Sequence, residues 1–509
     1  MNISLGVTCY ENIPAIRERC ENLTLKGVVI VSAFDNNGVL SYPAAFNNVL
    51  GVDINRSVHK LKDFIFVENN CVNLIGSANE QRLPWLNNTY EFVSGASFIA
   101  PYCTALVASI MESGIHDFYG ILQALKEKAI KTISCAPFIP YRKLDFAIGR
   151  AVAFPFNKEM HTVARFKTFL CGEVQAFYDV KYTGNISRSL SSLLGTIEGE
   201  DMCIQDYRAI DWQSDFDTLI LGHTSQLSDL LGIDFEEYFL LRCIKYHKNV
   251  FSFAEIRNKM FVQQFMQNNL QIYYPSITET CIPNNTIWKL RKIGKPVIGV
   301  FGTGPRQGKF TLQLKLRYLF ENSGYSVGML SSEPTAALFR ISQVYPMGYE
   351  SSVHIQGGNA VQLINFMMGE LEDENPDIIF VGSQSQTVPA TDGALKYYPI
   401  SQYEFLLGTA PDCYILCVNV FDENSYIERT IAFLESVFES KVLALALFPF
   451  DQANKWSILG TKKVMAPQQV IDDKIENLKL QFGIPVYCLT DDQNIIEIGE
   501  KCVEYFSEK

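Results

Sequence analysis

Three glycines and a lysine stand close together in the segment VIGVFGTGPRQGKFTLQL, and their spacing suits the binding of phosphate. An apolar run leads into the glycines, and Lys309 opens a leucine-rich helical pattern. Glycine lets backbone N–H groups approach an anion, the helix N-terminus adds its positive end, and lysine neutralises the outer phosphate oxygens. The residues predicted to bind a phosphate-bearing cofactor are Gly302, Thr303, Gly304, Gly308, Lys309 and Thr311. The alternative is a glycine-rich turn that happens to carry a lysine.

The loop departs from the common phosphate-binding pattern in two ways. Five residues instead of four separate Gly302 from Gly308. Phe310 occupies the place where a Ser or Thr commonly holds Mg²⁺, so we predict that Thr311, one position further on, takes that role.

A serine, Ser97 in the run SGASFIAP, lies where a strand pattern turns sharply into an apolar helix. This placement suits a nucleophile or a helix cap. A serine hydroxyl is a poor nucleophile until a base removes its proton, and that base needs an orienting carboxylate. His116 lies 19 residues beyond Ser97, roughly 28 Å away on a continuous helix.

Strands alternate with helices along the whole chain, which predicts an α/β fold of three α/β units. The units are a partial parallel sheet at 1–134, a small Rossmann-like domain at 146–280 and a P-loop NTPase-like domain at 290–509. The strands predicted for the last unit are 296–301, 326–330, 377–382, 413–421, 442–448 and 485–489. In the second unit, His161 and Arg165 share a helix face and His223 follows a strand, so each residue suits a ligand site or an exposed polar face.

Composition excludes several classes of partner. The chain has 48% hydrophobic residues and a net charge of −12, so a nucleic acid or an anionic membrane surface would be repelled. The N-terminus lacks the pattern of a signal peptide, and the apolar runs are too short to span a bilayer. Thirteen cysteines without a CxxC pair predict buried thiols in a reducing compartment, so we expect a cytoplasmic protein.

Residues 290–509 resemble, through nearly their whole length, the P-loop family that includes D-glutamate N-acetyltransferases. The resemblance rests on the blocks GTGPRQGKFT, SSEPTAALF, PDIIFVGSQSQTVP and LLGTAPDCYILCVN, in this order, and the loop spacing is also similar to that of dethiobiotin synthetase. It implies ATP or another phosphate-bearing cofactor such as acetyl-CoA, with Mg²⁺ as a candidate ion. The second unit is similar to the N-terminal half of clostridial peptide-maturation proteins.

This P-loop family usually has an acidic residue after the strand that matches DIIFV, but Gly382 stands there in this chain. The carboxylate for Mg²⁺ would then come from Glu333 or Asp377. Each of these two residues equally suits a solvated loop or a helix cap.

The runs MNISLG, VVIVSAFDNNG, SYPAAFNNVLGV and VSGASFIAPYCTALVASIM resemble, in this order, the later half of the subtilisin-like serine proteases. The resemblance implies that Ser97 is the nucleophile and that Asn36 donates to the oxyanion. Ala96 replaces the usual Thr, and Tyr102 stands where a histidine often follows the proline. The Asp and His segments of the family precede the strand that matches NISLG, so we expect little autonomous proteolysis.

The same resemblance predicts a sheet with an unpaired edge. The chain would then be a piece of a longer protease, or another polypeptide would complete the domain and supply Asp and His.

The leading prediction is a cytoplasmic peptide-maturation protein that acts on a precursor peptide and joins an incomplete subtilisin-like domain to a nucleotide- or acyl-cofactor-binding P-loop module. One alternative is a subtilisin-like endopeptidase completed by a missing segment or a partner chain. The other is a non-catalytic scaffold that binds the peptide. Neither nucleic acid nor membrane is an expected partner.

Overall fold

The computed structural model describes residues 1–8, 12–135, 138–195, 197, 199–283, 289–391, 393, 395–450 and 464–507. Residues 136–137 and 284–288, in the connections between the predicted units, lie outside this set. The chain divides into two compact units. The first consists of Met1–Pro140, Thr280–Gly294 and Gly358–Asp373, and the second consists of Tyr141–Glu279, Lys295–Gly357 and Glu374–Lys509.

The first unit is built on a six-stranded sheet with the order β1-β2-β3-β5-β4-β8. All neighbours are parallel except β4 and β5. Its strands are β1 (Asn2–Ile3), β2 (Ile30–Ala33), β3 (Val49–Asn55), β4 (Ile65–Glu68), β5 (Val72–Ser77) and β8 (Lys131–Ser134). Its helices are α1 (Ile13–Leu25), α2 (Ala96–Glu112), α3 (Phe118–Lys128) and α10 (Gly358–Asp373).

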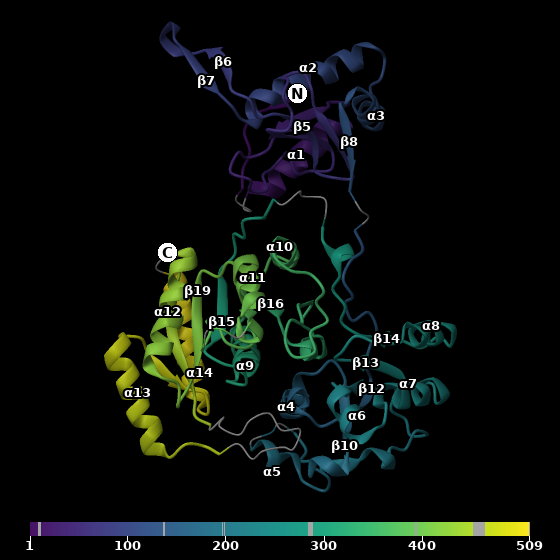
Figure 1. Cartoon of the computed structure of the whole chain (residues 1–509), viewed down its shortest axis with the longest axis vertical. Coiled ribbons are helices and arrows are strands. Elements are labelled where there is room, and N and C mark those ends of the chain that lie inside the picture. Colours follow the sequence, from purple (N-terminus) through teal and green to yellow (C-terminus); the bar gives the residue numbers. More distant parts are fainter. Residues whose placement is uncertain are drawn as a thin grey trace. The chain divides into compact units, whose positions relative to one another are not determined.

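The first unit has an edge strand, a projecting hairpin and a helix that packs against its sheet. The strand β1 lies at one end of the sheet order and pairs with β2, so the edge expected from the sequence is present. The hairpin of β6 (Gln81–Pro84) and β7 (Tyr90–Val93) extends away from the sheet (Figure 1). The helix α2 packs against β2 and β3 and buries Ile99, Cys103 and Val107 on the sheet.

The second unit contains two parallel sheets. One has the order β11-β10-β9-β12-β13-β14, in which all strands are parallel and the strand order reverses between β9 and β12. Its strands are β9 (Arg150–Phe154), β10 (Glu173–Asp179), β11 (Gln205–Asp206), β12 (Thr218–Leu221), β13 (Asn249–Ser252) and β14 (Ile272–Tyr273). Its helices are α4 (Lys158–Arg165), α5 (Leu190–Leu194), α6 (Ser225–Leu231), α7 (Phe235–Lys245) and α8 (Lys259–Gln267).

The other sheet has the order β17-β16-β18-β15-β19-β20-β21. Its strands are β15 (Val297–Gly302), β16 (Val327–Ser331), β17 (Gln343–Val344), β18 (Ile378–Gly382), β19 (Cys413–Asn419), β20 (Lys441–Phe448) and β21 (Val486–Cys488). Its helices are α9 (Lys309–Asn322), the 3₁₀ segment η8 (Pro334–Phe339), α11 (Ile400–Thr409), α12 (Asn424–Phe438), α13 (Gln468–Phe482) and α14 (Asp492–Ser507). The helices α9 and α14 pack against each other.

One hydrophobic core joins the two sheets of the second unit. Met160 and Val163 of α4 belong to the same buried cluster as Ala336 and Leu338 of η8. The backbone N–H of Cys171 also donates to Leu338 O at 2.7 Å. The α/β class is confirmed, and each of the three predicted units contributes one main sheet. The predicted second and third units nevertheless form one compact unit, because α4 and η8 are apolar where they meet.

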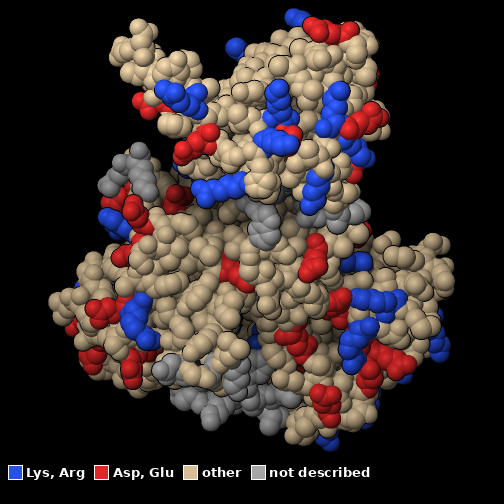
Figure 2. All heavy atoms as spheres, turned by 45° about the horizontal axis from the view of Figure 1, so that its top comes forward, with Lys and Arg blue, Asp and Glu red and all other residues tan. Residues whose placement is uncertain are grey.

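Positive and negative side chains are mixed on the surface. Lys and Arg lie among Asp and Glu over the face drawn in Figure 2, so the charge of the chain is spread over that face. In the part of the chain that the structure describes, no helix has both the length and the hydropathy needed to cross a bilayer.

Cys103, Cys243 and Cys502 are buried, as predicted for thiols in a protein core, and burial raises the pKa of Cys103 to about 12.

A buried ion pair stabilises the first unit. The guanidinium Nε of Arg291 lies 2.6 Å from Glu372 Oε2, and the Glu372 side chain is completely buried. Glu372 also accepts a hydrogen bond from the backbone of Gly294, at 2.6 Å. Arg291 forms a second pair with the exposed Asp373, at 2.9 Å. Burial raises the pKa of Glu372, and the Arg291 charge acts in the opposite direction.

We expect Arg291→Met to lower the free energy of unfolding by about 3 kcal/mol, because it leaves the buried Glu372 carboxylate without its counter-charge. Asp373→Asn removes the exposed partner of the same guanidinium and is the matched control, with little expected effect. Urea unfolding of both variants measures the difference. Equal stability of Arg291→Met and wild type would contradict this role of the pair.

Candidate phosphate-binding site

The predicted phosphate loop connects the central strand β15 to α9. β15 pairs with β18 on one side and β19 on the other, and all three run parallel. The carboxyl ends of these strands therefore meet at the loop, which is the edge where ligands of open parallel sheets bind. The first N–H groups of α9 have no intrahelical partner and lie at this edge.

Two of the loop glycines have a direct structural reason. A Cβ atom on Gly302 would lie 2.9 Å from Gln307 Oε1 and 3.1 Å from Lys309 Cδ, so a side chain there would displace the loop. Gly308 is the N-cap of α9 and has a left-handed backbone with φ of 79°. L side chains rarely adopt that conformation, so the turn that directs the helix N-terminus toward the loop favours glycine.

Side chains outside the predicted set hold the loop in shape. Gln307 donates from Nε2 to Thr303 Oγ1 at 2.7 Å and accepts from the backbone N–H of Gly304 at 2.8 Å. Thr303 in turn donates its hydroxyl proton to Asp422, which follows β19. The prediction that Thr303 binds the cofactor therefore needs a correction for its side chain, which is used within the loop.

Gln307 and Asp422 were missed by the sequence analysis. Gln307 is a polar residue in the loop, and Asp422 follows a buried strand, but nothing local in the sequence connects the two residues.

Lys309 lies almost completely inside the protein, with 6% of its surface exposed. Its Nζ donates to Gly304 O at 2.7 Å and to Ser385 O at 3.0 Å, so the ammonium group is held between the loop and the segment after β18. Burial lowers the pKa of Lys309 to about 8, while the nearby Glu333 and Asp422 carboxylates act in the opposite direction. The site thus concentrates one positive charge at the position where phosphate would bind.

Of the residues predicted to hold Mg²⁺, Thr311 and Glu333 lie near the phosphate loop, and the neighbouring Phe310 lies in the core. Phe310 is buried and its ring packs against Phe339, with centroids 5.7 Å apart, which explains why the residue at this position is apolar. Thr311 is partly exposed in the first turn of α9. Glu333 follows β16 at the same carboxyl edge, and burial raises its pKa to about 7, with a further contribution from the Glu159 carboxylate.

Asp377 does not join these residues, so its prediction as a metal ligand is wrong. It is exposed, precedes β18 and accepts a hydrogen bond from the backbone of Ser326 at 2.7 Å. The five residues of β18 lie between Asp377 and the loop edge, a separation of roughly 16 Å. The sequence could not exclude Asp377. Asp377 directly precedes one strand and Glu333 follows another, and in the sequence both residues look equally close to a strand end.

The carboxyl end of β18 carries a serine instead of an acid. A Cβ atom on Gly382 would lie 2.2 Å from Gln313 Oε1, so a carboxylate there would have to displace the buried Gln313 amide, which donates to Leu330 O. The next hydroxyl, Ser383 Oγ, is buried without a hydrogen-bond partner in the described structure.

The oxygen atoms of Thr311, Ser383 and Glu333 are suitable ligands for Mg²⁺, but they do not make up a complete coordination shell. Among the described residues, no cluster of three or more His, Cys, Asp or Glu side chains can hold a metal. Thr311, Ser383 and Glu333 therefore suit an ion that takes most of its ligands from phosphate and water, as Mg²⁺ does.

The other predicted site, at Ser97, has only part of its expected machinery. Asn36 Oδ1 accepts a hydrogen bond from the backbone N–H of Ala96 at 3.0 Å, so Asn36 lies at the N-terminus of α2 beside Ser97. His59 and His116 are exposed. The structure therefore brings Asn36 and Ser97 together, and no described imidazole forms a hydrogen bond with the Ser97 hydroxyl.

Comparison with known proteins identifies the C-terminal part of the chain. Residues 287–493 match the family described as "Domain of unknown function (DUF1611_C) P-loop domain". This part of the chain is therefore a P-loop domain.

Two solved structures are similar to the chain. The crystal structure of a DUF1611 family protein from Anabaena variabilis has a TM-score of 0.49 and 12% identity, and the match covers 70% of this chain and 99% of that one. Cobyrinic acid a,c-diamide synthase from Mycobacterium smegmatis, with bound ADP and magnesium, has a TM-score of 0.28 and 11% identity. That match covers 42% of this chain and 96% of the synthase.

A curated relative is the major intracellular serine protease of Bacillus subtilis (strain 168), which is 28% identical over 115 residues. The match covers 21% of this chain and 36% of the protease, so the chain spans well under half of that relative.

The shifted pKa values of Glu333 and Lys309 predict how phosphate binding depends on pH. As pH rises from 6 to 9, Glu333 gains a negative charge near pH 7 and Lys309 loses its positive charge near pH 8. Both changes disfavour an anion, so we expect the affinity for ADP without Mg²⁺ to fall by about tenfold or more over this range. Isothermal titration calorimetry measures it.

Glu333→Gln should remove the part of this decrease near pH 7. Glu321→Gln, on the exposed side of α9, is the matched control and should keep the wild-type profile. An affinity for ADP that rises with pH would contradict the assignment of these two groups.

The geometry at Ser97 predicts that its hydroxyl does not react with a fluorophosphonate probe, because no base removes its proton. Mass spectrometry of the treated protein measures labelling, with a Ser97→Ala variant as the blank. Labelling of wild type that the Ser97→Ala variant lacks would show that a base reaches Ser97.

Proposed function

We propose that the chain binds a nucleoside triphosphate with Mg²⁺ at residues 302–311 and transfers a group from it to an acceptor. The observation that carries this proposal is the buried ammonium of Lys309, held by Gly304 O and Ser385 O inside a glycine loop that opens a helix. Burying an ammonium costs several kcal/mol, and a structure keeps such a charge where an anion will compensate it.

Each loop residue has a part in binding. The backbone N–H groups at the start of α9 contact phosphate oxygens, and Lys309 exchanges its carbonyl partners for the outer phosphates. Thr311 and Glu333 would hold Mg²⁺ together with phosphate oxygens and water, with Ser383 as a further hydroxyl donor. The ion, when bound, neutralises charge on the phosphates.

The acceptor that we propose is a peptide. This part rests on the first unit, whose residues resemble a subtilisin-like protease and whose Asn36 lies beside Ser97. A protease-like domain without a base suits peptide binding more than cleavage, and the P-loop domain would then act on the bound peptide.

A second candidate is peptide cleavage at Ser97 with a base supplied by another chain. The hydrogen bond from Ala96 to Asn36 supports it, because it places an amide side chain next to the serine. The edge strand β1 offers backbone groups for a further strand. A partner that restores fluorophosphonate labelling of Ser97 would favour this function over the first.

Lys309→Ala should weaken binding of Mg·ATP about 10- to 100-fold, because a charge-assisted hydrogen bond contributes about 1.5–3 kcal/mol. Lys315→Ala is the matched control, since Lys315 lies on the same helix and pairs with the exposed Asp492 at 2.5 Å. Calorimetry with Mg·ATP measures both variants, and acetyl-CoA serves as the second ligand.

The outcomes separate the possible ligands. Loss of ATP binding in Lys309→Ala alone supports a nucleotide site. Binding of acetyl-CoA and not ATP, with the same dependence on Lys309, would replace the nucleotide by an acyl cofactor. Equal binding by wild type and Lys309→Ala would remove the loop from the function.

A further inference from the structure

His223 lies at the carboxyl end of β12, next to the place where the strand order of its sheet reverses. The chain continues from β9 to one side of the sheet and from β12 to the other. Ligands of open parallel sheets bind outside the carboxyl ends of the strands at such a reversal. The helix α4, which begins at Lys158, follows β9 at the same edge.

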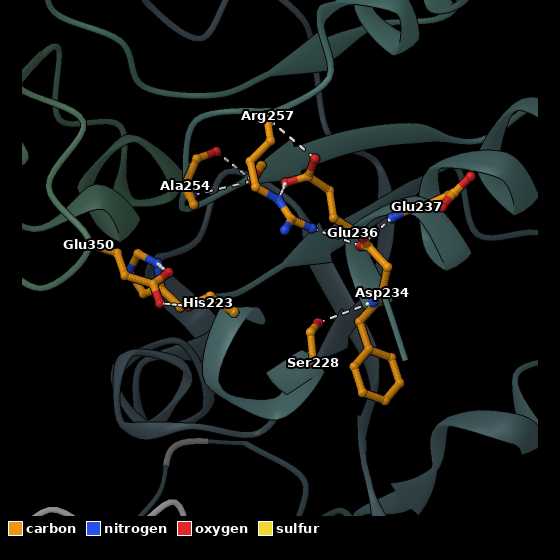
Figure 3. Close-up of polar contacts among 11 residues, drawn as sticks. His223, Ser228, Asp234, Glu236, Glu237, Ala254, Arg257 and Glu350 are labelled. Atoms are coloured by element: carbon orange, nitrogen blue, oxygen red, sulfur yellow. Dashed lines mark hydrogen bonds and ion pairs between the residues drawn. The ribbon is translucent and has the colours of Figure 1, made fainter. Parts of the chain in front are cut away.

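The His223 imidazole is buried and oriented by a carboxylate. His223 Nδ1 lies 3.0 Å from Glu350 Oε2, and 4% of the His223 side chain is exposed. Figure 3 shows the two side chains pointing toward each other, with Glu350 on the segment that follows β17. The hydroxyl of Ser225 donates to the other oxygen of the same carboxylate.

This geometry assigns a tautomer to His223. His223 Nδ1 is buried without a hydrogen bond of regular geometry among the described residues, and the nearest acceptor is Glu350 Oε2 at 3.0 Å. A carboxylate accepts, so this placement favours a proton on Nδ1 and a lone pair on Nε2 of the neutral ring. Burial would raise the pKa of Glu350, but the adjacent His223 imidazole holds that pKa below the usual value, so Glu350 is ionised. The rings of Tyr349 and Phe253 pack edge-on against the imidazole, with centroids 5.4 and 6.1 Å away.

The packing of α4 against η8, whose N-cap is Glu333, connects the sheet edge that carries His223 to the phosphate loop. The Glu333 carboxylate interacts electrostatically with Lys309 of the loop, with Lys158 and Glu159 of α4, and with His223. The two sheets of the second unit therefore contribute charged groups to the surroundings of one carboxylate. A group presented by the loop and an acceptor beside His223 would meet near Glu333.

We propose that His223 is the general base that deprotonates an acceptor with an N–H or O–H nucleophile, and that Glu350 is its positioning residue. This inference rests on the proposed function and adds the chemical class of the acceptor. A carboxylate acceptor is already a nucleophile and needs no base, whereas an amine or a hydroxyl must lose a proton. An oriented imidazole at this edge therefore favours an amine or a hydroxyl.

The proposed step balances in protons and electrons. The acceptor nitrogen or oxygen forms a bond to the terminal phosphorus of the nucleotide, and its proton moves to His223 Nε2. The bond between that phosphorus and the bridging oxygen breaks, and the nucleoside diphosphate leaves with the electron pair. Glu350 stabilises the imidazolium that results.

Histidine NMR tests the tautomer and the role of Glu350 without any substrate. The chain has six histidines, and His223→Asn assigns the resonance of His223 in uniformly ¹⁵N-histidine-labelled protein. We expect a protonated Nδ1 and an unprotonated Nε2 at pH 8. Glu350→Ala removes the carboxylate that lies 3.0 Å from Nδ1, so the neutral ring should lose its preference for a proton on Nδ1.

His354→Asn is the matched control, because His354 also pairs with a carboxylate, Glu255, at 2.7 Å, but its side chain is 53% exposed. Hydrolysis of Mg·ATP, with water as the O–H nucleophile, should fall about 100-fold in His223→Asn and stay unchanged in His354→Asn. Calorimetry should give the same Mg·ATP affinity for both variants and wild type. Turnover by Glu350→Ala should fall as well, because the imidazole loses the carboxylate that orients it.

Three results would overturn the proposal. They are a proton on Nε2 of neutral His223, a tautomer that Glu350→Ala leaves unchanged, and no loss of Mg·ATP turnover in His223→Asn. Absence of turnover by the wild-type protein would also count against a base at this position. Failure of the proposed function is recognised separately, because it would appear as unchanged Mg·ATP binding in Lys309→Ala.

Discussion

The site depends on the burial of one ammonium group. Lys309 has lost nearly all contact with water, and two backbone carbonyls compensate only part of that loss. The cost appears as a lowered pKa, which means that the neutral form is nearly as stable as the charged one. An anion in the loop would restore the missing compensation, so the structure stores an affinity for phosphate in the desolvation of a single residue.

Other parts of the P-loop domain hold that residue in place. The clamp of Thr303, Gln307 and Asp422 fixes the loop from the β19 side, while Phe310 packs into the core and fixes the first turn of α9. A loop held on both sides loses little conformational freedom on binding, so more of the interaction energy remains for the ligand. Gly302 belongs to this packing because a Cβ atom there would lie against Gln307 and Lys309, whereas Gly308 is favoured by its left-handed backbone.

The second unit brings two parallel sheets to one site. Its shared core fixes α4 against η8, and this packing brings charged groups from both sheets around Glu333. The proposed function would divide phosphate binding and acceptor activation between the sheets, with Lys309 after a strand of one and His223 after a strand of the other. The first unit contrasts with this arrangement, because Ser97 has a neighbouring amide from Asn36 but no base in the described structure.

The sequence by itself determined the features that arise from neighbouring residues. The alternation of strands and helices, the strand β15 that ends at Gly302, and the helix that begins at Lys309 follow from local periodicity and residue type, and the structure confirms them. Only the tertiary structure decided which side chains face the loop. Thr303 meets Asp422 across 119 positions of sequence, and His223 meets Glu350 from a different sheet. Asp377 seemed as close to the loop edge as Glu333 but lies at the other end of its strand. Such pairings depend on packing between distant segments, which a single sequence does not encode in any local pattern.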